Sequence, residues 1–315
     1  MKTVAAFFRL IRWQNLLFIV ITQLLFYYCV YVPLLKQFPD TSKQILFFFL
    51  TLASVFIAAA GYIINDYFDI QIDIINKPGR IVINKFIKRR WAIVWHFTLS
   101  SLGILISFYI SIKTGEWLIS VINIFCVLFL LFYSTTFKRK LLSGNLIIAA
   151  LTAWVILVVY LFAGADVFSL SGWANESVDF NVRKLFKFTL LYASFAFTVT
   201  LIREVIKDLE DMEGDRKYNC TTMPISWGVP ASKVFTAVWI VVCIAALAIV
   251  QLYAWQSGWW YVALYTLLLI ILPLVYMLRK LYKAATPAHY HALSNIVKMV
   301  MLFGILSMLF LKFTP

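Results

Sequence analysis

Long apolar runs alternate with short polar segments along the whole chain. The runs are about 20 residues long, which is the length that an α-helix needs to cross a bilayer, and the alternation typical of a membrane β-barrel is not seen. The sequence therefore predicts an all-α fold, a polytopic transmembrane helical bundle of about nine spans, with residues 1–315 as a single integral-membrane domain. The predicted spans cover residues 16–35, 45–64, 91–112, 117–133, 146–163, 186–204, 234–255, 259–278 and 294–312.

Basic residues are unevenly distributed between the two sides of this predicted bundle. The formal net charge is +14, and 20 of the 28 lysines and arginines fall in segments on the side of the N-terminus. Because cytoplasmic loops carry an excess of Lys and Arg, we expect a multi-pass protein of the inner (plasma) membrane with a cytoplasmic N-terminus. The same bias explains the positive charge, so no nucleic-acid partner is expected.

Acidic residues gather in two segments on the predicted cytoplasmic side. The first reads NDYFDIQIDIINKPGR from Asn65 to Arg80, and the second reads KDLEDMEGD from Lys207 to Asp215. Each contains three aspartates separated by three and then four residues, a spacing that returns to one face of a helix. The sequence therefore predicts two carboxylate clusters, formed by Asp66, Asp69 and Asp73 and by Asp208, Asp211 and Asp215.

The chemistry of these clusters predicts a Mg²⁺ site. Oxygen ligands suit Mg²⁺, which is usually held by a few carboxylates together with substrate phosphate oxygens. Neither segment contains the His or Cys that zinc would favour. Mg²⁺ bound to a diphosphate neutralises the charge that develops on the diphosphate as it leaves. We therefore expect the two clusters to face each other across a central apolar cavity that holds an isoprenoid diphosphate.

Several basic residues near the triplets are candidates for binding phosphate oxygens. They are Lys77, Arg80, Lys138, Arg139, Arg203 and Lys207. The positive-inside bias accounts for each of them individually as well. Arg203 lies within the end of a predicted span, where an unpaired charge is costly; its partner is expected to be a phosphate or a carboxylate such as Glu204. Asn65 is expected to orient Asp69 or to contact a phosphate.

These segments closely resemble the UbiA superfamily of intramembrane prenyltransferases, whose first signature is NDxxDxxxD and whose second is a further Asp-rich segment. Arg12 and Asn15 in RWQN resemble the first-helix element of the family, and YSTTFKRKLLSGN, from Tyr133 to Asn145, resembles another shared segment. The resemblance implies catalytic roles for Asn65, Asp66, Asp69, Asp73, Asp208, Asp211 and Asp215, with the six aspartates as metal ligands. It implies substrate binding by Asn15, Lys77, Arg80, Tyr133, Lys138, Arg139, Arg203 and Lys207.

Within the superfamily the two Asp segments look most like those of digeranylgeranylglyceryl phosphate synthases. This resemblance implies transfer of a polyprenyl group, geranylgeranyl, from its diphosphate to a hydroxyl of a glycerol-phosphate-type lipid. Two departures bear on the acceptor: IVINK at Ile81–Lys85 stands where relatives usually have a Pro-, Ser- and Gly-bearing segment, and the Arg that relatives often carry around Thr221 is not matched. An aromatic quinone precursor or a tetrapyrrole is the alternative acceptor. A transporter or a non-catalytic lipid-binding membrane protein is the alternative of another class.

Overall fold

The chain folds into helices that correspond one to one with the predicted spans. The structure is a computed structural model that describes residues 2–35, 39–170 and 176–312. Within these ranges it contains no strand, and its one isolated β-bridge joins Ile83 to Ile87. Nine helical stretches in the described ranges are long and apolar enough to cross a membrane: Trp13–Leu34, Thr41–Asn76, Arg89–Thr114, Trp117–Thr135, Ser143–Gly164, Val182–Glu210, Gly228–Gln256, Trp260–Lys283 and Pro287–Leu311.

The chain divides into two compact units, which are described one at a time. The first comprises residues 1–138 and 154–190, and the second comprises residues 139–153 and 191–315. Helices α7 (Ser143–Leu170) and α8 (Glu176–Glu210) each contribute residues to both units. The single domain and the central apolar cavity that the sequence suggests stay predictions.

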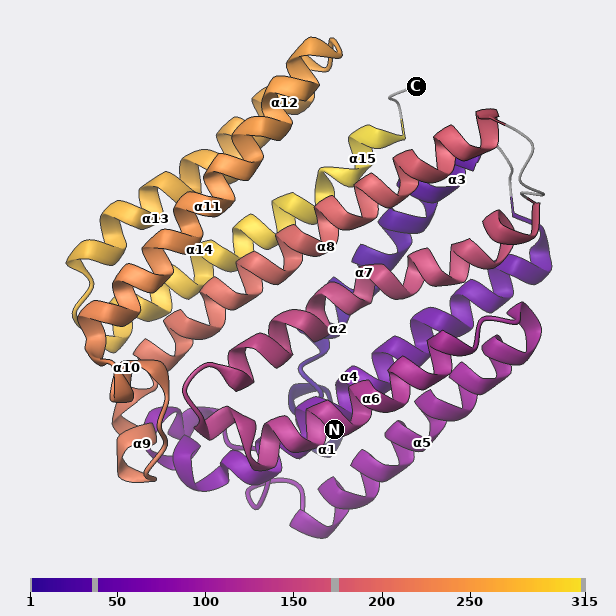
Figure 1. The fold of residues 1–315 in the computed structure, drawn as a ribbon. Coiled ribbons are helices and arrows are strands. Elements are labelled where there is room, and N and C mark those ends of the chain that lie inside the picture. Colours follow the sequence, from indigo (N-terminus) through magenta and orange to yellow (C-terminus); the bar gives the residue numbers. More distant parts are fainter. Residues whose placement is uncertain (1, 36–38, 171–175, 313–315) are drawn as a thin grey trace. The chain divides into compact units, whose positions relative to one another are not determined.

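Three long helices dominate the first unit: α4 (Thr41–Asn76), α5 (Arg89–Thr114) and α6 (Trp117–Thr135). They pack against one another and run side by side, in purple and magenta, in Figure 1. The N-terminal part of the unit contains α1 (Lys2–Leu10), α2 (Trp13–Leu25), the π-helical turn η1 (Phe26–Tyr31) and α3 (Val32–Leu35). α4 and α5 approach closely at Gly103, where an added Cβ would lie 2.7 Å from Cγ1 of Ile57. Small residues permit such close helix packing in membranes.

Helix α4 has a defined start and end, and its end carries the first Asp triplet. Asp40 caps its N-terminus by accepting a hydrogen bond from the backbone N–H of Lys43 at 2.9 Å. The helix ends at Asn76, because Pro78 restrains the backbone of Lys77. A 3₁₀ turn, η2 (Pro78–Arg80), follows, and Val82, Ile83 and Ile87 then pack against α1 and α4 in one apolar cluster. The loop after the triplet is thus anchored in the core of the unit.

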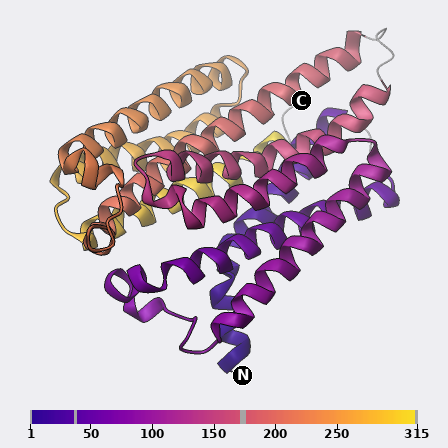
Figure 2. The same cartoon turned by 60° about the horizontal axis from the view of Figure 1, so that its bottom comes forward.

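The second unit is built on the C-terminal half of α8 and the helices that follow it. These are α9 (Met212–Lys217), α10 (Met223–Ser226), α11 (Gly228–Gln256), α12 (Trp260–Thr266), η4 (Leu267–Ile271), α13 (Leu272–Lys283), α14 (Pro287–Leu306) and α15 (Met308–Leu311). Figure 2 shows α11, α13 and α14, in orange to yellow, lying alongside one another. Their core contains Ile206 of α8, Ile240 of α11, Met277 of α13 and Val297 of α14.

The second Asp triplet does not lie on one continuous helix, so that part of the sequence prediction is wrong. Asp208 is in α8, Asp211 lies at the junction, and Asp215 is in α9. At Asp211 the backbone has φ −96° and ψ 7°, which departs from helical values and bends the chain. Backbone hydrogen bonds from Asp211 to Lys207 and from Asp215 to Asp211 continue through the bend, so the helical register is kept.

Replacing Gly304 with leucine is expected to destabilise the second unit. A Cβ added at Gly304 would lie 2.3 Å from Cε1 of Phe195, so the two residues could not keep their present positions. Overpacking of this kind costs about 1–3 kcal/mol, and we expect a lower midpoint of thermal unfolding in detergent. Gly79→Ala is the matched control because nothing lies within 4 Å of its added Cβ. Equal midpoints for Gly304→Leu and the native chain would contradict the close packing of α14 on α8.

Candidate functional site

The first Asp cluster occupies the last three turns of α4. Asp66, Asp69 and Asp73 lie on this one helix, as the sequence predicts. Asp69 is buried, with 6% of its side chain exposed, whereas Asp66 keeps 19%. Asn65, one turn before Asp69, donates from Nδ2 to Oδ2 of Asp69 at 2.8 Å. This hydrogen bond supports the prediction that Asn65 orients Asp69, and a catalytic role for Asn65 stays a prediction.

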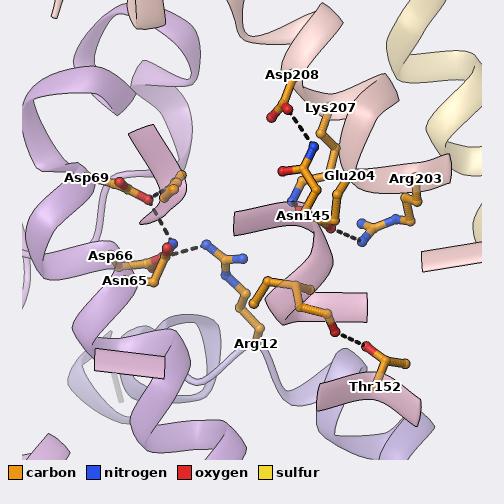
Figure 3. A network of polar contacts seen from close by, with 12 residues as sticks. Arg12, Asn65, Asp66, Asp69, Asn145, Thr152, Arg203, Glu204, Lys207 and Asp208 are labelled. Atoms are coloured by element: carbon orange, nitrogen blue, oxygen red, sulfur yellow. Dashed lines mark hydrogen bonds and ion pairs between the residues drawn. The ribbon is translucent and has the colours of Figure 1, made fainter. Parts of the chain in front are cut away.

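Two cations from distant parts of the sequence contact these carboxylates. Lys138, which lies in the 3₁₀ turn η3 (Phe137–Arg139), forms an ion pair with Oδ2 of Asp69. Nη2 of Arg12 donates to Oδ1 of Asp66 at 2.6 Å, and the guanidinium lies over the ring of Tyr62, 5.2 Å from its centroid. Figure 3 shows Arg12 pointing toward Asp66. Charge-assisted hydrogen bonds of this kind are roughly twice as strong as neutral ones.

Arg12 sits at the break between α1 and α2 in an uncommon backbone conformation. Its φ of 51° and ψ of 54° lie in the left-handed region, which costs a residue with a Cβ about 1–2 kcal/mol. Its carbonyl accepts from the backbone N–H of Asn15 at 2.7 Å, which starts α2. Strained backbone held in place by its surroundings tends to occur at functional sites. Here it directs the side chain of Arg12 toward Asp66.

Arg12 and Lys138 both remain cations in this setting. Burial acts to lower the pKa of Arg12, but Asp66 and Tyr62 raise it by more, so the net shift is upward. Burial also acts to lower the pKa of Lys138, while Asp69 and Tyr133 raise it by more. The first unit therefore places two fixed positive charges against Asp66 and Asp69.

The second cluster begins with Asp208 in the last turn of α8. Nδ2 of Asn145, in the first turn of α7, donates to Oδ2 of Asp208 at 2.8 Å, and Asn145 is 7% exposed. Asp215 is also buried, at 7%. The loop after α9 is tied down because the backbone N–H of Thr221 donates to the carbonyl oxygen of Arg139 at 2.7 Å. An amide thus holds one aspartate in each cluster, Asn65 on Asp69 and Asn145 on Asp208.

Glu204 pairs with the two cations that the sequence offers as phosphate ligands on α8. Nζ of Lys207 lies 2.8 Å from Oε2 of Glu204, and Nη1 of Arg203 lies 3.4 Å from Oε1 (Figure 3). Glu204 is 6% exposed. A carboxylate this deeply buried needs such compensation. Nε of Arg203 is buried and, within the described part of the chain, has no hydrogen-bond partner.

The other predicted substrate-binding residues lie at the edges of these clusters. Asn15 is half-buried in the first turn of α2, and Tyr133 is buried near the end of α6. Lys77 follows the last residue of α4, and its backbone N–H donates to the backbone carbonyl oxygen of Asp73 at 2.8 Å. Arg139 is exposed in η3. The side chain of Arg80 lies outside the described residues. Their roles in binding stay predictions.

The donor set of the site suits Mg²⁺ in its chemistry. Among the described residues, no three His, Cys, Asp or Glu side chains form a group that could hold a metal ion as they stand. Oδ1 of Asn65 is buried and, among those residues, has no hydrogen-bond partner. A buried acceptor of this kind needs a donor or a cation. The orphaned oxygen and the carboxylates beside it therefore fit a hard cation or its bound water.

A model of the UbiA prenyltransferase family matches residues 24–302. The chain belongs to this family. Its similar relatives include the digeranylgeranylglyceryl phosphate synthase of Methanoregula boonei, 33% identical over 69% of this chain and 68% of the relative. That of Methanothermobacter thermautotrophicus is 34% identical over 65% of each chain. The chain thus spans about two thirds of the length of the curated relatives it matches. Membership of the UbiA family confirms the prediction of a prenyltransferase.

Solved structures confirm the UbiA fold. A structure of a digeranylgeranylglyceryl phosphate synthase superposes with a TM-score of 0.60 at 24% identity, covering 98% of this chain and 99% of that one. A UbiA homologue from Archaeoglobus fulgidus bound to GPP and Mg²⁺ gives a TM-score of 0.58 at 15% identity, covering 96% and 99%. With nine candidate spans in the described ranges and UbiA relatives, the chain is a multi-pass integral membrane protein.

Two contact residues of the site were not among the predicted site residues. Arg12 belongs to the segment that resembles the UbiA first-helix element, and its sequence signal is a cation next to a long apolar run. Asn145 is the last residue of the segment that begins at Tyr133. Neither signal reveals a partner, because Arg12 and Asp66 lie 54 residues apart and Asn145 and Asp208 lie 63 apart.

Replacing Asn145 with leucine is expected to raise the Mg²⁺ concentration needed for half-maximal turnover by about 10- to 100-fold, the usual effect of removing a residue that orients a ligand. Asn145 would act as a positioning residue, because it fixes Oδ2 of Asp208. Maximal turnover at saturating Mg²⁺ should fall less. The check is a Mg²⁺ titration of turnover. Asn123→Leu is the control, since Asn123 is also a buried amide but contacts Ser107 and Trp154. Identical Mg²⁺ dependence in native and Asn145→Leu protein would contradict this role.

Proposed function

We propose that the chain transfers a geranylgeranyl group from its diphosphate to a hydroxyl of a glycerol-phosphate-type lipid in a Mg²⁺-dependent reaction. The names of the curated relatives support this choice of substrates. The observation that carries it is the arrangement of the first cluster, where a buried carboxylate–amide pair, Asn65 and Asp69, lies beside the cations Arg12 and Lys138. Oxygen ligands and fixed cations together suit a metal-bound diphosphate.

Both Asp clusters are assigned to the metal in this proposal. Asp66, Asp69 and Asp73 would hold it in the first unit, and Asp208, Asp211 and Asp215 in the second. Bound Mg²⁺ would neutralise the negative charge that develops on the departing diphosphate. Asn65 and Asn145 would act as positioning residues, because each donates a hydrogen bond to one of the proposed ligands.

Arg12 and Lys138 would bind the diphosphate oxygens. Each is now paired with an aspartate, so a cation that takes over that carboxylate leaves the basic side chain available for a phosphate. The diphosphate oxygens would then replace the aspartates as the anionic partners of both cations. Arg12 suits the task because its planar fork matches phosphate oxygens, while Lys138 acts as a compact point charge. Asn15, Lys77, Arg80, Tyr133, Arg139, Arg203 and Lys207 remain proposed substrate contacts.

The proposed reaction exchanges one bond to carbon for another. The bond between C1 of the allylic chain and the diphosphate oxygen breaks, and its electron pair leaves with the diphosphate. The acceptor hydroxyl oxygen forms the new ether bond to C1. Its proton passes to a carboxylate or to the released diphosphate, since an alcohol that attacks a carbocation-like centre needs only a weak base. The excess of basic residues on the side of the N-terminus supports a cytoplasmic location for both Asp clusters.

Product mass is the direct test. The purified chain is incubated with Mg²⁺ and geranylgeranyl diphosphate, with geranylgeranylglyceryl phosphate or an aromatic acid as the acceptor in parallel reactions. We expect a diether phosphate and an equivalent amount of diphosphate, both abolished by chelation of the metal. Prenylation of the aromatic acid alone would overturn the acceptor and keep the Asp clusters. Uptake of either compound into vesicles without diphosphate release would overturn the enzyme proposal.

A further inference from the structure

A cavity of about 630 Å³ lies within the second unit, apart from the residues assigned to catalysis. Its apolar wall includes Leu209, Met212 and Val229, and its basic residues are Arg216, Lys217 and Lys233. The same walls carry Glu210 and Glu213. We propose that this cavity binds the phosphate headgroup of a membrane lipid, with the first carbons of the lipid tails against the apolar wall. The proposal does not depend on the function proposed above.

The cavity lies on a different face of the α8–α9 segment from the Asp triplet. Glu210, Glu213 and Lys217 follow one another at intervals of three and four residues, so they share one face of a helix. Asp208, Asp211 and Asp215 have the same spacing in a different register, and the backbone hydrogen bonds at Asp211 and Asp215 keep that register through the bend. None of the six aspartates lines the cavity. The cavity is therefore lined by residues other than the proposed metal ligands.

The depth of the cavity suits a lipid headgroup. Leu209 lies in the last turn of one candidate span, and Val229 lies in the first turn of the next. Ala284 follows the last residue of a third span, and Pro287 is the first residue of a fourth. Four helices thus end or begin around the cavity. At this level a bilayer changes from hydrocarbon to headgroups, and long basic side chains meet lipid phosphates.

The charges that line the cavity favour an anion. Glu210 is already engaged, because Nδ1 of His291 lies 2.9 Å from its Oε1. Lys233 donates to the carbonyl oxygens of Tyr282, at 3.3 Å, and of Ala284. An ammonium has three donors, so Lys233 can still donate to a ligand. Arg216 and Lys217 are exposed at the rim. The cations Arg216, Lys217 and Lys233 outnumber the acids Glu210 and Glu213, so the lining of the cavity carries net positive charge.

A free phosphate would use only part of this site. Arg216 and Lys217 can bind phosphate oxygens, but the half-buried side chains of Met212 and Val229 present apolar surface that inorganic phosphate cannot cover. A lipid phosphate covers both. Its phosphate group meets the basic rim, while its tails remove the apolar wall from water and continue into the bilayer.

The test measures lipid binding to the full-length chain by native mass spectrometry in detergent. The probes are dioleoyl phosphatidic acid, dioleoylglycerol, which has the same tails without the phosphate, and inorganic phosphate. We expect phosphatidic acid to bind and dioleoylglycerol to bind much more weakly. The double variant R216Q/K217Q should lose about tenfold in affinity for phosphatidic acid, as expected for the loss of charge-assisted hydrogen bonds. Ala285→Trp, which adds bulk to the lining of the cavity without changing its charge, should reduce binding as well.

The control is R279Q/K280Q, which removes two exposed charges from the same unit at positions that do not line the cavity. It should bind phosphatidic acid as the native chain does. Thermal unfolding of every variant checks its fold. Equal losses in R216Q/K217Q and R279Q/K280Q would overturn the proposal, because binding would then follow net charge. Displacement of phosphatidic acid by an equal concentration of inorganic phosphate would overturn the assignment to a lipid.

Discussion

Replacing Asp69 with alanine is expected to reduce Mg²⁺-dependent release of diphosphate by about 100- to 1,000-fold, the effect of removing one group that stabilises the charge of a transition state. Asp69 is the best-connected carboxylate of the first cluster, because it accepts from Asn65 and pairs with Lys138. Its loss would remove a proposed metal ligand and leave Asn65 without the group that it orients. The measurement is diphosphate release by purified protein at saturating geranylgeranyl diphosphate.

The control for Asp69→Ala lies on the same helix. Asp40 caps the N-terminus of α4 and is exposed, so Asp40→Ala should cost about 1 kcal/mol of stability and leave diphosphate release unchanged. Asp211→Ala tests the second cluster in the same way and is expected to abolish Mg²⁺-dependent turnover in a folded protein. Near-normal turnover in both Asp69→Ala and Asp211→Ala would overturn the two-cluster mechanism.

The sequence predicted the spans well because hydropathy and helix length are local properties. Every predicted window overlaps an observed helix, and each of these helices is longer than its window. The second window ends at residue 64, whereas α4 continues to Asn76. A hydropathy window stops at polar residues, while the backbone hydrogen bonds of a helix do not depend on side-chain polarity. For this reason the first Asp triplet is part of a span rather than of the loop after it.

Partners that are distant in sequence could not be predicted from the same information. Asn65 and Asp69 are four residues apart on one helix, so their contact could be anticipated. Lys138 and Asp69 are 69 residues apart, and only the packing of the first unit shows that they meet. The bend at Asp211 was missed because helical spacing alone does not reveal where a helix is interrupted. Regular spacing indicates the helical register, which the backbone hydrogen bonds across this bend keep, but it does not reveal the bend.

Replacing Glu204 with alanine is expected to destabilise the protein by about 3 kcal/mol, because breaking a buried ion pair leaves uncompensated charge. Glu204 contacts both Lys207 and Arg203, whose side chains are 27% and 18% exposed. Without it, two adjacent cations at the end of a span would repel each other in a poorly solvated place. We expect a clearly lower midpoint of thermal unfolding in detergent.

Glu204 could instead act with Asp208, since the two residues are four apart on α8 and can share a face. Measurements on Glu204→Ala distinguish a structural ion-pair role from a role as a metal ligand. A structural partner of Arg203 lowers the unfolding midpoint in Glu204→Ala while the surviving folded protein keeps its Mg²⁺ dependence. A metal ligand leaves the midpoint near that of the native chain and raises the Mg²⁺ requirement, as Asp208→Ala should. Glu213→Ala is the control for removal of an acid from this region, because Glu213 is exposed. The contacts of Glu204 with Lys207 and Arg203 favour its structural role. An unchanged unfolding midpoint in Glu204→Ala would reverse that assignment.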